Sequence, residues 1–314
     1  MAMAAPRLFL VDVFAQSPLA GNPLAVVVSD TALADATMQA IAAEMNFSET
    51  TFVPRTARAD GAFPVRMFTP AQEVDFAGHP ILGTAWVVRR NVLRASAPEI
   101  RLALNVGVVP VTFEGKGHSE VAWFEAPPVT LGARLPPSFV ARALGLGARD
   151  VEMRPPVQVA RSGTAATLVP VRSLDALRRA RLDLARLGPL VSQGAPKLAY
   201  LFCREAEGTG NHVTARFFFV ANGVREDPAT GNGAAFLGAY LLEHGVMGPG
   251  PLDLRIEQGT DVGRPSLVRL RAHRAQGRVV TSVGGGVLPV ARGVLEPGVH
   301  RPVTVASPRS GRVR

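Results

Sequence analysis

Apolar and polar positions alternate in short runs along most of the chain, and a few longer apolar segments interrupt them. Alternation with a period of two predicts strands that are buried on one face, whereas apolar residues spaced three and four apart predict helices. The predicted strands are residues 7–14, 24–28, 49–53, 63–68, 100–104, 108–113, 121–124, two near 157 and 168, 197–203, 213–220, 254–257, 267–272, 279–283 and 287–294. The predicted helices are residues 32–44, 80–90 and 137–144, one after Ser173 and one near Asn232. Short strands with few helices favour a mixed sheet wrapped around a helix over alternating βαβ units.

One helix start has a distinctive sequence. The segment 226–233, Glu-Asp-Pro-Ala-Thr-Gly-Asn-Gly, ends a strand-like run and leads into the apolar run 234–242. Pro228 fixes the turn, and the Asp227 side chain can either cap the backbone or face a ligand. Backbone N–H groups at a helix start attract an anion, and a glycine lets the ligand come close. A substrate carboxylate would fit there, although capping and turning alone are also compatible with the pattern.

A related construction occurs about half a chain earlier. In residues 66–80 a strand-like run leads through a loop with acidic residues to Gly78 and His79, and Pro80 suits the first turn of the following helix. The chain therefore carries two helices that begin at glycine, at Gly78 and at Gly231. If the two halves are pseudo-symmetric, these helix starts face one cleft and could hold a small anionic substrate between them.

Length and composition agree with this picture. A chain of 314 residues with 47% hydrophobic content can form two domains with ordinary cores, and two prolines at 127 and 128 mark the best boundary between them. No charged segment followed by an apolar one opens the chain, and no apolar run approaches the length of a membrane span. We therefore expect a soluble cytoplasmic protein with no membrane partner.

Several classes of chemistry are disfavoured by the sequence. The single cysteine, Cys203, lies in an apolar run far from both glycine turns, which excludes a racemase that uses two thiols. The histidines other than His79 are not spaced from Cys, Asp or Glu residues as metal ligands are, so we expect no metal ion. No phosphate-binding loop or dinucleotide fingerprint occurs either, so we expect no cofactor. The formal charge of +9 comes from scattered arginines without a nucleic-acid-binding motif, and we expect no nucleic-acid partner. The densest arginine cluster, around Arg178, is interpreted as the solvated side of the helix after Ser173, with leucines at 174, 177, 184 and 187 on the other side.

Six blocks in order along the chain resemble the PhzF-like phenazine-biosynthesis isomerases, which are relatives in fold of diaminopimelate epimerase and proline racemase. The blocks are Phe14 with 21–27 (Gly-Asn-Pro-Leu-Ala-Val-Val), 46–52 (Asn-Phe-Ser-Glu-Thr-Thr-Phe), 66–70 with 76–80 and 83–84, 226–231, 257–259 with 263–266, and 283–285. The resemblance spans nearly the whole chain. It implies an α+β fold of two pseudo-symmetric domains, each a mixed sheet curled around a central helix, with the active site in the cleft between them.

The resemblance also implies the domain limits. Residues 1–128 form the N-terminal domain, to which a strand at about 286–299 returns, and residues 129–285 form the C-terminal domain. Residues 300–314 form a basic tail that is expected to fray. A homodimer is expected by resemblance.

The resemblance also implies which residues form the site. Glu49 takes the place of the catalytic acid/base, and an apolar setting would raise its pKa toward a useful range. His79 and Asp227 take the places of residues that flank the substrate and support proton movement. The backbone at Gly78, Gly231 and Asn232 would bind the substrate carboxylate, and Ser48, next to Glu49, is a further candidate for substrate binding.

The function implied is a cofactor-independent isomerase that transfers a proton within a small cyclic or amino-bearing carboxylate of the dihydro-3-hydroxyanthranilate type. The sequence departs from that of the phenazine-pathway enzymes at Asn232, because those enzymes carry serine after the Thr-Gly pair. This difference leaves the identity of the substrate open. Two alternatives also remain. The chain could be an amino-acid epimerase or racemase that uses carboxylate and histidine groups in place of thiols, or it could be a non-catalytic binding member of the family.

Overall fold

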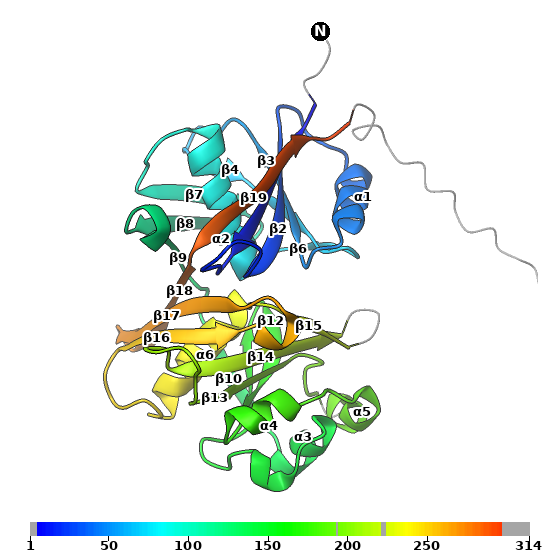
Figure 1. Cartoon of the computed structure of the whole chain (residues 1–314), viewed down its shortest axis with the longest axis vertical. Helices are drawn as coiled ribbons and strands as arrows, with labels where there is room; N and C mark the ends of the chain where they lie inside the picture. Colours follow the sequence, from blue (N-terminus) through cyan, green and yellow to red (C-terminus); the bar gives the residue numbers. More distant parts are fainter. Residues whose placement is uncertain (1–4, 193, 221–223, 297–314) are drawn as a thin grey trace, which may run out of the picture.

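The computed structural model describes residues 5–192, 194–220 and 224–296. Figure 1 shows two lobes stacked along the long axis of the molecule. The first lobe contains β1–β8, α1, α2 and β19, the second lobe contains β10–β17 and α3–α6, and β9 and β18 connect them. The predicted basic tail at 300–314 lies outside the described residues. Among the described residues, no helix combines the length and apolar character that a membrane crossing requires.

The strands form two sheets. The first sheet has the order β19-β1-β2-β3-β5-β6, and the second has the order β10-β11-β12-β13-β14-β16-β17-β18-β9-β8-β7-β4, with β15 paired to β14. The strands of the first lobe are β1 (Arg7–Val13), β2 (Asn22–Ser29), β3 (Thr50–Pro54), β4 (Phe63–Pro64), β5 (Arg66–Phe68), β6 (Glu73–Val74), β7 (Glu99–Leu104), β8 (Gly107–Glu114) and β19 (Val287–Val294). The others are β9 (Val121–Glu125), β10 (Thr130–Arg134), β11 (Gln158–Ser162), β12 (Thr164–Pro170), β13 (Ala199–Cys203), β14 (Val213–Val220), β15 (Val224–Asp227), β16 (Leu252–Gln258), β17 (Ser266–Ala275) and β18 (Arg278–Gly285).

The helices divide into two central ones and four peripheral ones. They are α1 (Asp35–Met45), α2 (Gly78–Val87), α3 (Pro137–Ala143), α4 (Leu174–Arg179), α5 (Leu184–Ser192) and α6 (Gly231–Glu243). A π-helical turn (Val88–Val92) extends α2, and 3-10 turns lie at Gly117–Ser119, Ala148–Asp150 and Thr260–Val262. All but one residue of α2, and ten of the thirteen residues of α6, are buried. A helix that is apolar on all sides is a core helix, so α2 and α6 are the central helices of the two lobes.

The run of buried residues in β2 shows how the first lobe is built. Val26 and Val28 belong to the core that contains α2, whereas Val27 packs with Met38 and Ile41 of α1. Helices therefore cover both faces of this strand, which explains why its sequence is continuously apolar instead of alternating. Its neighbour β1 pairs with β2 on one side and with β19 on the other.

Two predicted elements are divided in the structure. The single strand predicted at 63–68 is two strands, because β4 pairs with β7 in one sheet and β5 pairs with β3 in the other. The single helix predicted after Ser173 is also two, α4 and α5, and the chain leaves the helical conformation at Ala180. Arg216 explains this break, because its Nη1 donates to the carbonyl oxygens of Leu177, Arg178 and Ala180 and so satisfies groups at the end of α4.

Candidate active site

The two glycine-started helices meet end to end between the lobes. A Cβ atom added to Gly78 would lie 2.9 Å from the Cα atom of Gly231, and one added to Gly231 would lie 3.0 Å from the Cα atom of Gly78. Neither Ala77 nor Thr230, the residues that precede the helices, makes a side-chain hydrogen bond that caps its helix. The absence of a Cβ atom at both positions is what allows this approach, and it places two positive helix ends side by side.

Asp227 lies at the end of β15, three residues before the Thr230 cap of α6, and is buried. Its Oδ1 accepts hydrogen bonds from Asn22 Nδ2 at 2.8 Å and from Ser48 Oγ at 3.2 Å, and its Oδ2 accepts one from Thr230 Oγ1 at 2.6 Å. Burial raises the pKa of Asp227 to about 6, and the three donors oppose this shift. The carboxylate is therefore held in one orientation by partners from both lobes.

His79 is the second residue of α2, and only 3% of its surface is exposed. Its Nδ1 lies 3.3 Å from Asn22 Nδ2. The nitrogen of the Asn22 amide, and not its oxygen, faces His79, because this nitrogen donates to two acceptors, Asp227 Oδ1 and the carbonyl oxygen of Ala229. An amide nitrogen cannot accept a hydrogen bond, so the His79 Nδ1 that faces it carries no proton, and the ring proton resides on Nε2. Burial lowers the pKa of His79 to about 3, so the ring is neutral at physiological pH.

Glu49 lies between α1 and β3, with its Oε2 3.5 Å from His79 Nε2. Its side chain keeps 17% exposure, but Oε2 is fully buried and has no hydrogen-bond partner among the described residues. Burial raises the pKa of Glu49 to about 8, and the charge of Asp227 adds to the shift. Glu49 is consequently a carboxyl group that can both hold and release a proton near neutral pH.

The arrangement separates the protonation states of neighbouring groups. The neutral imidazole of His79 presents its Nε2–H beside the Glu49 carboxyl group, whose pKa lies near the operating pH, while the second carboxyl group, Asp227, accepts hydrogen bonds through both oxygens. Such divergent environments are typical of acid/base sites. The site can move a proton to or from a bound molecule without a further group.

Most of the residues expected from the sequence are brought together here. Glu49, His79 and Asp227 form one connected group, Ser48 donates to Asp227, and Gly78 contacts Gly231. Asn232, the second residue of α6, is partly exposed, and its side chain makes no hydrogen bond within the described ranges 5–192, 194–220 and 224–296. The catalytic and binding roles assigned to these residues stay predictions.

The structure adds two residues to this group. Asn22 joins His79, Asp227 and Ala229, although in the sequence it stands out only as a member of the block 21–27. Gln258 Nε2 donates to the Asp227 carbonyl oxygen, and Gln258 Oε1 accepts from the Thr230 N–H, so Gln258 fixes the turn that carries Asp227. A polar residue between Gly21 and Pro23 at the start of an apolar strand was the available signal for Asn22.

Within the described part of the chain, no group of three or more His, Cys, Asp or Glu side chains is placed to hold a metal ion. Cys203 is buried at the end of β13, where its Sγ lies 3.6 Å from the carbonyl oxygen of Glu205. It belongs to the core formed with α3, α4 and α5.

The proteins that resemble this chain in sequence point to one family. The profile of the phenazine biosynthesis-like protein family (PhzC-PhzF) matches residues 11–293. The chain is 34% identical over 296 residues to an uncharacterized isomerase of Mesorhizobium japonicum, covering 91% of this chain and 97% of the relative. It is 36% identical over 291 residues to the trans-2,3-dihydro-3-hydroxyanthranilate isomerase of Pseudomonas aeruginosa, covering 91% and 98%.

Among solved structures, a PhzF-family phenazine biosynthesis protein of Bacillus anthracis superposes with a TM-score of 0.84 at 23% identity, covering 94% of this chain and all of that one. This likeness concerns the fold. It confirms the α+β epimerase-like architecture of two domains that the sequence predicted. The domain limits at 128 and 285 stay predictions.

Proposed function

The chain belongs to the phenazine biosynthesis-like (PhzC-PhzF) family and is an isomerase, and we propose that it moves a proton within a small unsaturated, amino-bearing carboxylate of the dihydro-3-hydroxyanthranilate type. The observation that carries this proposal is the position of Glu49. Its buried Oε2 faces a neutral His79 beside two helix N-termini, and it is left without a hydrogen bond by the described residues.

In the proposed reaction, ionised Glu49 removes a proton from a carbon next to an activating group, breaking the C–H bond and leaving its electron pair on the substrate. The same carboxyl group then returns the proton to another carbon, so a double bond shifts and no redox partner is needed. The starts of α2 and α6 bind the substrate carboxylate and stabilise the negative charge that develops. The His79 Nε2–H donates a hydrogen bond to the substrate or to Glu49 at each stage.

The geometry favours this single-carboxyl transfer over racemisation by Glu49 and His79. A two-base racemase places its acid/base groups on opposite faces of one carbon atom. Glu49 Oε2 and His79 Nε2 lie only 3.5 Å apart, so no carbon can be placed between them. Asp227, the other candidate for the second base, already accepts three hydrogen bonds through its two oxygens.

The proposal is tested by following conversion of trans-2,3-dihydro-3-hydroxyanthranilate in the ultraviolet with the wild type and the Glu49→Gln variant. General acid–base catalysis contributes about 10²- to 10⁴-fold, and we expect the variant to lose about that much in kcat. The Glu44→Gln variant, which changes an exposed glutamate at the end of α1, is the matched control and should retain wild-type rates. Turnover of chiral amino acids with loss of optical rotation would instead support epimerisation, and binding without any turnover would support a non-catalytic role.

A further inference from the structure

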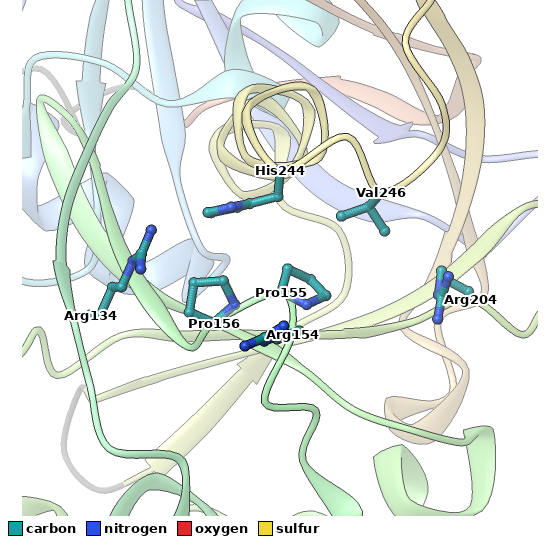
Figure 2. A pocket seen from close by; sticks show the side chains of 7 residues that line it. All are labelled: Arg134, Arg154, Pro155, Pro156, Arg204, His244 and Val246. Atoms are coloured by element: carbon teal, nitrogen blue, oxygen red, sulfur yellow. The ribbon is translucent and has the colours of Figure 1, made fainter.

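A hollow lies in the second lobe, at the end of α6 opposite the candidate active site. Its volume is about 580 Å³, within the size range of small-molecule sites. Figure 2 shows His244 and Val246 on one side of it, Arg154, Pro155 and Pro156 on the facing side, and Arg134 and Arg204 at its two flanks. The lining comes from the end of β10, the segment before β11, the residue after β13 and the end of α6.

The charge of this hollow is not balanced by the protein. The side chains of Arg134 and Arg154 form no ion pair and no hydrogen bond with any of the residues that the structure describes, and of the three arginines only Arg204 has a side-chain partner, Glu152 Oε1 at 3.3 Å. Three arginines thus line one hollow, and of the two nearby carboxylates Glu152 is paired with Arg204 and Glu243 with Arg274 outside the hollow. The carbonyl end of α6 adds about half a negative charge, which leaves a clear positive excess. One guanidinium group can donate two parallel hydrogen bonds to the oxygens of a phosphate group. The excess of positive charge therefore suits a phosphate dianion.

His244 adds a polar group whose proton can be located. Its Nε2 lies 2.8 Å from Gln158 Oε1, and the Gln158 amide nitrogen donates to the carbonyl oxygen of Gly132. The Gln158 oxygen therefore accepts, the neutral ring carries its proton on Nε2, and Nδ1 is left without a partner among the described residues. The ring packs edge-on against Tyr240, with centroids 4.6 Å apart. Burial and then the charge of Arg134 hold the pKa of His244 below its ordinary value, and Glu243 opposes them.

The remaining wall is apolar. Pro155, Pro156 and Val246 line the hollow between the charged groups, and they offer a surface for a carbon skeleton but no donor for a second anionic group. From this combination, we propose that the hollow is a binding site for a small organic phosphate, with the phosphate held by the two unpaired arginines, Arg134 and Arg154, and the carbon skeleton packed on the prolines and Val246.

This site is separate from the candidate active site. The thirteen residues of α6 place its two ends about 20 Å apart, with Gly231 at one end and His244 at the other. A ligand in the hollow therefore cannot touch Glu49 or His79. Because the arginines are exposed to solvent, we expect millimolar to submillimolar affinity that weakens with salt.

The test follows the imidazole signals of the full chain by NMR while phenyl phosphate is added at constant ionic strength. The six histidines are assigned with single His→Gln variants. A bound dianion next to His244 favours its protonated form, so we expect saturable shifts confined to His244 and an apparent pKa for it that rises. Inorganic phosphate should bind at least threefold more weakly, and phenol should leave the signal unchanged.

Two arginine variants provide the controls. Arg154→Gln should weaken phenyl phosphate binding at least tenfold, whereas Arg94→Gln, which removes an exposed arginine of the first lobe, should change it less than twofold. Equal weakening in both variants would show general charge attraction and overturn the proposal. An unmoved His244 signal at 20 mM phenyl phosphate would overturn it as well, and equal shifts with chloride would do the same.

Discussion

Replacing Glu49 by Gln should stabilise the folded protein, and the gain should grow as the pH rises from 4 to 9. Burial raises the pKa of the Glu49 carboxyl from 4.5 to about 8, with a further contribution from the charge of Asp227. As the pH rises, the Glu49 carboxyl group therefore loses its proton at a lower pH in the unfolded chain than in the folded protein. The contribution of Glu49 to stability is fully present below pH 4.5 and is lost as the pH rises through about 8. Glutamine has no such ionisation.

The size of the effect follows from the two pKa values. Each unit of difference between them corresponds to about 1.4 kcal/mol in the free energy of unfolding. The wild type should lose about 3 kcal/mol relative to Glu49→Gln at pH 6.5 and about 5 kcal/mol above pH 8. The value of 5 is an upper limit, because the Glu49 side chain keeps 17% exposure to water.

The assay is urea unfolding followed by circular dichroism for both proteins at unit steps of pH. The difference in unfolding free energy should be small at pH 4 and should rise with a slope of about 1.4 kcal/mol per pH unit between 5 and 7. Glu44→Gln, which alters an exposed carboxyl, should show no such slope. A difference between wild type and Glu49→Gln that stays constant from pH 4 to 9 would refute the buried, protonated Glu49 described here.

Three further predictions concern catalysis and folding. The kcat/KM of the wild type should rise with pH and level off above about 8, because Glu49 must be ionised to accept a proton; a flat profile from pH 6 to 9 would contradict this. Gly231→Ala should lower kcat/KM at least tenfold and cost about 1–3 kcal/mol of stability, because its Cβ would meet the Gly78 backbone at 3.0 Å. Gly188→Ala, whose Cβ meets nothing within 4 Å, is the control, and equal losses in both would argue against the helix contact. Arg216→Met should lower the free energy of unfolding in urea by about 3–5 kcal/mol, because it leaves the buried carboxylate of Glu226 unpaired. A decrease below 1 kcal/mol would exclude that explanation.

The sequence predicts the two central helices well because their starts depend on local signals. Gly78 and Gly231 precede long apolar runs, and both helices begin at these residues. The sequence did not predict the division of the strand at 63–68, because the division depends on distant partners. The first half pairs with β7 in one sheet, and the second half pairs with β3 in the other. The break between α4 and α5 was missed for a similar reason, since it depends on Arg216, which lies 36 residues along the chain from Ala180.

The same limit applies to the candidate site. Glu49, His79 and Asp227 could be proposed because each lies in a recognisable sequence block. Asn22 could not be assigned a role, because the hydrogen bond from its side chain to Asp227 spans 205 residues. The tautomer of His79 depends on that contact and becomes evident only when the two lobes are placed together.

Deuterium uptake in heavy water, followed by NMR during turnover of trans-2,3-dihydro-3-hydroxyanthranilate, shows which group carries the proton. The Glu49 carboxyl is partly open to solvent, so its proton exchanges with deuterium. We predict that the wild type places deuterium on the one carbon that receives the proton and that Glu49→Gln does so about 10²- to 10⁴-fold more slowly. Deuterium uptake by Glu49→Gln at the wild-type rate would contradict the assignment of Glu49 as the group that carries the proton.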